Sequence, residues 1–391
     1  MEMTGCSTWC YTQSMKQQNH NPSTVKKVNL IKLSADVHKR DYKVCRQIGD
    51  QNIQPAQVFK PEEAFEWAIK QLEGAERVVL CYEAGFSGFS FARRLQSHGV
   101  EAVVMCPQKL DERCKRVNTD KRDARAIASR LDRYLAGNDE ALLKARIPTE
   151  KEEDERAVTR QRAQLLKARK QFEAQGRSLL MFKGLSCPTH WWRGTPSDWK
   201  QTVERHQWPA QMVELLEVYR RMALAADTEI VALTIKIEKE AEANLPASMP
   251  ALPNGFGQLS MEILRREVCD WHRFSNRGKV GSFFGMCSAE NSSGDHQSQG
   301  SITKTGNPRG RHVLIELAWR ALAFQPDYWV VKKFKPRMEK TQARSVARKK
   351  MIVAMARLIA VDLWRLYTSQ STLAKLGLKA KITKPYVLKE V

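Results

Sequence analysis

A four–three alternation of apolar residues runs through the middle of the chain. Its members are Met212, Leu216, Tyr219, Ala223, Ala226, Ile230, Leu233 and Ile237. This spacing places them on one stripe of a long α-helix, and such a helix is stable only when the stripe is covered. A second stripe upstream repeats every seven residues: Val158, Leu165, Phe172 and Leu179. We therefore expect a helical coiled-coil region over residues 149–245, paired within the chain or between chains.

Shorter, strand-like runs precede this helical region. Residues 28–33, 42–47 and 53–59 are separated by turn-sized gaps and predict a β-meander. A helix from Pro61 to about Leu72, a buried strand over 78–82, a helix near 89–97 and a strand over 101–106 follow. This order predicts an α/β domain over residues 28–148, with a mixed sheet covered by helices. Residues 1–27 are rich in Gln, Asn, Ser and Lys, and we expect a disordered tail.

The remainder of the chain predicts a second globular unit. Between the two helical stripes, residues 187–209 contain four tryptophans and several prolines, which suggests a compact loop or cap. After Leu245 the sequence is rich in loops, and we expect a mainly α-helical domain over 246–370 followed by a basic tail over 371–391.

The charge balance favours a polyanionic partner. Lys and Arg number 65 against 43 Asp and Glu, a net charge of +22, which suits nucleic acid or an anionic membrane better than a neutral partner, although a charge excess for solubility is an alternative. No segment approaches the roughly 20 apolar residues of a membrane span, and the N-terminus lacks an apolar signal core. The nine cysteines form no Cys-x-x-Cys pair, so we expect reduced thiols in a cytoplasmic protein.

Carboxylates stand at the ends of the predicted strands. Asp36 ends the first strand, Glu83 ends a later buried strand, and Asp120 and Asp123 are expected in the first turn of a helix. If all four met, they would repel one another unless a divalent cation neutralised them, and oxygen ligands select Mg²⁺ or Mn²⁺. Singly, Asp36 fits a turn or cap, and Asp120 or Asp123 fits an N-cap. Glu83 is harder to explain otherwise, because a buried unpaired carboxylate is costly.

A second polar constellation lies in the C-terminal half. The turn Ser292-Ser293-Gly294 can present a hydroxyl on an open backbone, with Lys304, Arg309 and Arg311 downstream to hold a phosphate. From composition alone, a basic loop that touches a nucleic-acid backbone explains the same residues. Further on, a dense basic stretch is either a solvated helix face or a phosphate-binding strip; it includes Lys332, Lys333 and Lys335.

Several motifs in this order resemble the insertion-sequence one-ten transposases, also called bridge recombinases. The resemblance covers roughly residues 28–366 and is carried by four stretches: Ala35-Asp36-Val37-His38-Lys39, Tyr82-Glu83-Ala84-Gly85, Thr119-Asp120-Lys121-Arg122-Asp123-Ala124, and Ser292-Ser293-Gly294 with Gly300-Ser301-Ile302-Thr303-Lys304-Thr305-Gly306-Asn307. No one motif is specific, but the ordered set is.

The resemblance implies a function and a set of roles. It implies an RNase H-like, RuvC-like N-terminal domain whose Asp36, Glu83, Asp120 and Asp123 bind Mg²⁺, and a C-terminal transposase domain whose nucleophile is Ser293, with Ser292 as a local rival. It also implies double-stranded DNA from the element ends and target, a structured guide RNA, and a dimer or tetramer in which the carboxylates of one chain face the serine of another. The setting would be the prokaryotic nucleoid.

Two other functions fit the same residues. A RuvC-like endonuclease would use metal-activated water, and its second domain would only bind DNA. A catalytically inactive nucleic-acid-binding derivative would use no chemistry, but four carboxylates would then only repel phosphate.

Overall fold

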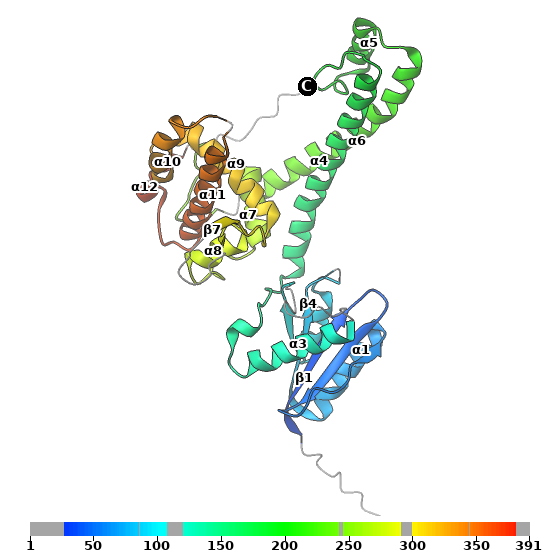
Figure 1. The fold of residues 1–391 in the computed structure, drawn as a ribbon, viewed down its shortest axis with the longest axis vertical. Coiled ribbons are helices and arrows are strands. Elements are labelled where there is room, and N and C mark those ends of the chain that lie inside the picture. Colours follow the sequence, from blue (N-terminus) through cyan, green and yellow to red (C-terminus); the bar gives the residue numbers. More distant parts are fainter. Residues whose placement is uncertain are drawn as a thin grey trace, which may run out of the picture. The chain divides into compact units, whose positions relative to one another are not determined.

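The chain divides into two compact units, with unit 1 ending at Pro148 and unit 2 beginning at Thr149 (Figure 1). The computed structural model describes residues 27–85, 87–107, 120–241, 245–290, 299–343 and 345–380. Most of the predicted disordered tail and the Ser292-Ser293-Gly294 turn lie outside these residues. None of the helices in the described ranges is both long enough and apolar enough to span a membrane.

Unit 1 is built on a five-stranded mixed sheet with the order β3-β2-β1-β4-β5. Strands β1, β2 and β3 are antiparallel neighbours, whereas β4 and β5 run parallel to β1. The elements are β1 (Val28–Val37), β2 (Tyr42–Ile48), β3 (Gln57–Phe59), α1 (Pro61–Lys70), the 3₁₀ turn η1 (Gln71–Glu73), β4 (Ala75–Glu83), α2 (Ser90–Ser97), β5 (Glu101–Met105), α3 (Asp120–Leu135) and the 3₁₀ turn η2 (Asp139–Ala141). The predicted mixed sheet with covering helices is confirmed.

The two faces of this sheet have separate hydrophobic cores. Alternate residues of β1 and β4, such as Leu33 and Leu80, pack with Phe65 of α1 and Leu95 of α2. The intervening residues of β4 face the opposite way, where Val79 and Cys81 pack with Ile127 and Leu131 of α3. Because side chains alternate along a strand, successive residues of β1 and of β4 face opposite sides of the sheet. One set faces α3, and the other faces α1 and α2.

Unit 2 begins with a long helical hairpin. Helix α4 (Glu150–Phe182) and helix α6 (Ala210–Ala241) lie side by side, joined at one end by a segment that contains α5 (Pro196–His206) (Figure 1). Arg169 binds Asp227, and Arg162 donates a 2.6 Å hydrogen bond to Thr234, so the two helices are antiparallel. Most of the predicted α6 stripe is buried, including Leu216 and Ile230. The pairing within one chain is therefore observed, while pairing between chains stays a prediction.

The tip of this hairpin is closed by aromatic residues. Trp191, Trp192, Trp199 and Trp208 are buried together with Leu180 and Leu216. The Nε1 atom of Trp191 donates to the carbonyl of Glu173 on α4 at 3.1 Å, and the Trp191 ring covers Gly176. The predicted compact cap thus also contains a helix, α5, whose N-terminus is capped by Thr195.

The rest of unit 2 is a mainly helical domain around one core. Its elements are α7 (Gln258–Val268), α8 (Arg277–Phe283), the ribbon strands β6 (Ser288–Glu290) and β7 (Gln299–Ile302), α9 (Pro308–Phe324), α10 (Trp329–Glu339), α11 (Val346–Tyr367) and α12 (Leu373–Leu376). The helical C-terminal part is as predicted. The core extends into the segment predicted as a basic tail, since Leu376 and Leu378 are buried in it.

Replacement of Gly176 by alanine tests how the hairpin tip is packed. Helix propensity alone would make Gly176→Ala stabilising by about 1 kcal/mol. A β-carbon there would stand 2.0 Å from the Trp191 ring, so we expect Gly176→Ala instead to lower the free energy of unfolding by about 1–3 kcal/mol. Urea denaturation followed by tryptophan fluorescence measures the sign. A gain in stability, as helix propensity alone predicts, would contradict the packing account.

Candidate active site

Asp36 and Glu83 lie on the same face of the unit 1 sheet. Strands β1 and β4 are parallel neighbours with Ala35 opposite Tyr82, so the next residues of the two strands, Asp36 and Glu83, follow side by side. Tyr82 packs on the α1–α2 side, which leaves Glu83 on the side of α3. The same alternation places Asp36 on the α3 side, at the carboxyl end of its strand.

Helix α3 brings a third carboxylate to this edge. The buried Lys32 donates to Asp132 near the end of α3 at 2.5 Å, and the Ser34 hydroxyl donates to the carbonyl of Ala124 at 2.8 Å. These contacts align α3 antiparallel to β1, so that its N-terminal turn lies at the strand ends. Asp123 is half-buried in that turn. Asp120 is the first residue of α3, as predicted, and its side chain lies outside the described residues.

The electrostatics of Glu83 link these residues. Burial raises the pKa of Glu83, and the charges of Asp36 and Asp123 raise it further, against a smaller opposite effect of Arg130. Carboxylates influence each other in this way only when they are near one another. Asp36 also contacts His38, with 3.1 Å between Oδ2 and Nε2. Within the described ranges, however, no group of three or more Asp, Glu, His or Cys side chains is close enough to hold a metal ion.

The donor chemistry nevertheless fits a hard divalent cation. The three described carboxylates supply only oxygen donors, and each is at least partly shielded from solvent. Burial first, and then the charges of Asp36 and Asp123, raise the pKa of Glu83. A bound cation would oppose these effects.

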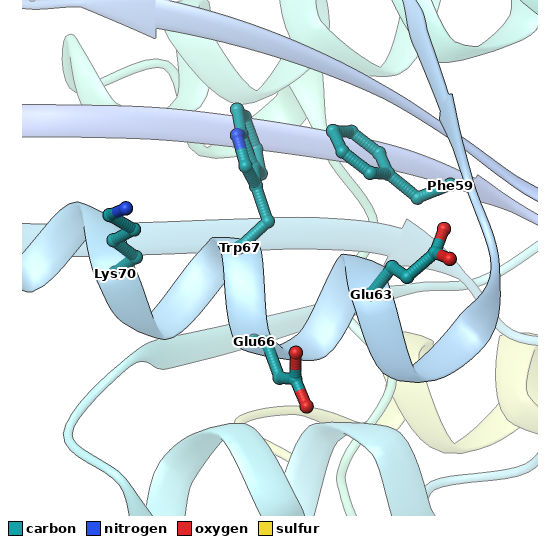
Figure 2. A pocket seen from close by; sticks show the side chains of 5 residues that line it. All are labelled: Phe59, Glu63, Glu66, Trp67 and Lys70. Atoms are coloured by element: carbon teal, nitrogen blue, oxygen red, sulfur yellow. The ribbon is translucent and has the colours of Figure 1, made fainter.

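A hollow along α1 is a poor site for a phosphate. It is lined by Phe59, Glu63, Glu66, Trp67 and Lys70, and Figure 2 shows the two aromatic rings beside each other above the helix. Trp67 and Phe59 are in contact, with 5.1 Å between ring centroids. Two carboxylates against one ammonium group would repel nucleic acid.

The predicted phosphate-binding residues of unit 2 gather at the start of α9. Lys304 and Arg309 are exposed on either side of Asn307, which caps α9 by accepting from the amides of Arg309 and Gly310. Arg311 instead donates to the carbonyls of Phe284 and Lys304, at 2.7 and 3.2 Å. Arg311 therefore holds the loop together, whereas Lys304 and Arg309 face solvent.

The second predicted basic group lies on α10. Lys332, Lys333 and Lys335 are all exposed. Lys332 lies 3.6 Å from Asp327, and Lys335 lies 4.0 Å from Glu339. These contacts are loose surface pairs, which leave the ammonium groups accessible to a phosphate.

Comparison with known proteins assigns the chain to a family. Residues 252–334 match the family described as "Transposase IS116/IS110/IS902 family". The putative transposase y4rJ of Sinorhizobium fredii is 30% identical over 308 residues, which span 73% of this chain and 76% of that protein. The chain belongs to this transposase family. The putative transposase y4qE of the same organism is 29% identical over 258 residues, 64% of this chain and 61% of that protein. The transposase for insertion sequence element IS1533 of Leptospira borgpetersenii is 24% identical over 300 residues, 74% and 85% of the two chains.

The protein is thus an insertion-sequence transposase, an enzyme that acts on DNA. The family match spans the Ser-Ser-Gly turn, Lys304, Arg309 and Arg311. Two neighbours of the carboxylates were not singled out from the sequence as functional. His38 stands two residues after Asp36. Arg130 stands seven residues after Asp123, which is two helical turns, so Asp123 and Arg130 lie on the same side of α3. These two spacings are the sequence features from which His38 and Arg130 could have been identified.

Glu83→Gln tests the electrostatic cost of the Glu83 carboxylate. A carboxyl group whose pKa is raised by folding favours the folded state while protonated, and this contribution is lost as the pH rises through the folded pKa. At pH 7 Glu83 therefore destabilises the metal-free protein relative to a neutral side chain, and we expect Glu83→Gln to raise Tm at pH 7 but to change it little near pH 4. Differential scanning calorimetry in the presence of a chelator measures both values.

The matched control is Glu76→Gln, since Glu76 lies on the same strand and is exposed. The difference in Tm between the two pH values should be the same for Glu76→Gln as for the wild type. A lower Tm for Glu83→Gln at pH 7 would mean that Glu83 is already well paired within the protein.

Proposed function

We propose that this transposase is an RNA-guided recombinase that cuts and rejoins DNA through a covalent bond to Ser293, assisted by a Mg²⁺-binding carboxylate site. The observation that supports the proposal is the placement of Asp36, Glu83 and Asp123 on one face of the sheet, at the carboxyl ends of β1 and β4, where burial and the charges of Asp36 and Asp123 raise the pKa of Glu83. This arrangement supports a RuvC-like assignment of the unit 1 sheet.

The carboxylates are proposed to hold metal. Asp36, Glu83 and Asp123, with Asp120 one helical turn from Asp123, would be the ligands of one or two ions. Bound there, Mg²⁺ or Mn²⁺ would neutralise the carboxylates and withdraw charge from phosphate oxygens. The N-terminal turn of α3 adds its own positive dipole end at the same place.

The bond changes are proposed to occur on Ser293. Its hydroxyl oxygen attacks the phosphorus of a DNA phosphodiester, the bond from that oxygen to phosphorus forms, and one phosphorus–oxygen bond to a deoxyribose breaks. The serine proton passes to water, and the departing deoxyribose oxygen takes one up. Lys304 and Arg309 would hold the phosphate, because both are exposed at the positive end of α9. Reversal with another DNA end completes the exchange.

The partners follow from the same proposal. Double-stranded DNA from the element ends and the target is joined by a structured RNA that pairs with both. The net charge of +22 suits several polyanions at once. A dimer or tetramer is proposed as the working form, and the exposed apolar residues on α6, Leu215, Val218 and Met222, are available for contact with another chain. Sequencing of RNA that co-purifies with the protein tests the guide, and light scattering of that complex tests the assembly.

Ser293→Ala is the decisive variant. It removes one oxygen atom, so we expect folding and DNA affinity to stay unchanged while covalent adduct and recombination both disappear. Denaturing gels with end-labelled DNA detect the adduct. Ser292→Ala and Ser301→Ala serve as controls and should retain it. Adduct in Ser293→Ala would place the nucleophile elsewhere; cleavage without adduct in the wild type would favour a nuclease that uses water.

Arg309→Gln tests the phosphate contact. The loss of one arginine–phosphate contact should weaken DNA binding of all sequences alike and reduce the slope of log K against log salt by about 1. Fluorescence anisotropy across a salt series measures the slope. Lys200→Gln, at an exposed position of α5, is the control for a change of net charge alone. Equal slopes for the two variants would show that Arg309 does not contact the DNA phosphates.

A further inference from the structure

A buried carboxylate connects three elements of unit 2. The side chain of Glu267, at the end of α7, is 0% exposed. Arg160 of α4 donates to both of its oxygens, at 2.9 and 2.8 Å. The Nδ2 atom of Asn307 donates to its Oε2 atom at 2.7 Å. We call these three residues the relay.

The relay ends on the helix that presents the basic residues. Asn307 uses its Oδ1 atom to cap α9 and its Nδ2 atom to bind Glu267. Its backbone amide donates to the carbonyl of Phe283 at the end of α8 at 2.7 Å. The preceding Gly306 is packed so closely that a β-carbon would lie 2.6 Å from that same carbonyl. The position of Asn307 therefore fixes the start of α9 against α8.

The charges within the relay are matched. Burial would raise the pKa of Glu267, but the hydrogen bonds from Arg160 and Asn307, with the charges of Arg160 and Arg309, outweigh it, and the pKa is lowered. Glu267 is thus an ionised acceptor with three donated hydrogen bonds, and charge-assisted bonds of this kind are strong and directional.

A neighbouring ion pair joins the same two helices without touching α9. Glu155 of α4 accepts from Arg265 of α7 at 2.6 Å. Loss of this pair would loosen α4 from α7 but leave Asn307 bound to Glu267. The chain therefore offers its own control for a purely stabilising interaction.

We propose that Glu267 is a positioning residue, which ties the basic N-terminal turn of α9 to helix α4 so that Lys304 and Arg309 stand in a fixed place. This inference rests on the proposed function, because it takes those two residues as the phosphate-holding groups. Glu267 itself is fully buried and touches no substrate; it acts through Asn307.

The test distinguishes the two roles of Asn307, as the cap of α9 and as the donor to Glu267. Asn307→Asp keeps an oxygen acceptor for the α9 amides, since Asp caps helices as well as Asn, but sets a carboxylate against Glu267. Glu267→Gln removes the charge that Arg160 binds. In the double variant, the amide introduced at position 267 can donate to the carboxylate introduced at position 307, so the hydrogen bond is restored with its direction reversed. Glu155→Gln is the control, and Tm of each full-length variant shows that it folds.

Hydrogen exchange of the peptide over residues 299–312 is measured without DNA. We expect Asn307→Asp to speed exchange of its protected amides at least about tenfold, as loss of a charge-assisted bond predicts, and we expect the double variant to recover most of this. Glu155→Gln should lower Tm and leave this peptide unchanged. Any of three results would overturn the relay. These are unchanged exchange in Asn307→Asp, equally fast exchange of this peptide in Glu155→Gln, or no recovery in the double variant.

Covalent adduct formation with DNA, measured on the same proteins, separates the two proposals. Reduced adduct in Asn307→Asp with recovery in the double variant supports the positioning role. Wild-type levels of adduct in Asn307→Asp would overturn that role. If the wild type forms no adduct while exchange responds as expected, the serine mechanism fails and the relay stands. Weaker DNA binding by Asn307→Asp in fluorescence anisotropy, recovered in the double variant, would then support the positioning role, and unchanged binding would overturn it.

Discussion

An unpaired charge is costly to bury, and this constraint decides how both units of the transposase pack. In unit 1, Lys32 points from the middle of β1 into the space under α3 and is matched there by Asp132. In unit 2, the guanidinium of Arg266 is 0% exposed and is held by Glu262 of its own helix and Glu240 of α6. Each pair can form only when a particular helix lies in a particular place. Any packing that separated these helices would leave a buried charge unpaired, at a cost of ~3–5 kcal/mol, the range typical of such a loss.

The same constraint explains why the carboxylate edge of unit 1 suggests a reaction and not only a fold. Lys32 and Ser34 satisfy their polar groups with α3, and Asp36 follows them on the same face. Near Asp36 the described residues place two further carboxylates, Glu83 and Asp123, and burial together with the charges of Asp36 and Asp123 raises the pKa of Glu83. A perturbed carboxylate of this kind is typical of a site that binds a ligand or reacts. In unit 2 the local charge is of the opposite sign, since Lys304 and Arg309 extend into solvent from a helix start that is already positive.

Much of this could be predicted from the sequence, for identifiable reasons. Strand β4 contains a continuous apolar run, and α1 begins with Pro61 and two acidic residues. The positions predicted for these elements, and for β1 and β5, were correct within a few residues. The hairpin of α4 and α6 followed from the spacing of Leu216 and its neighbours. Helix α5 was missed because it is short and only two of its apolar residues, Trp199 and Val203, pack on the hairpin. The relay could not be predicted, since 107 residues separate Arg160 from Glu267 and no local pattern connects them.

Strand β1 has a consequence for how such a protein can change over time. Its even-numbered residues from Lys32 to Asp36 face α3, and its odd-numbered residues from Ile31 to Ala35 face the other core. A deletion of one codon between Lys32 and Asp36 would place the two side chains on opposite faces of the sheet: either the carboxylate would leave the α3 side, or the lysine would be buried among apolar groups. Substitution can alter this strand one side chain at a time, but a change in its length cannot be absorbed. The length of β1 is therefore less free to vary than the identity of most of its side chains.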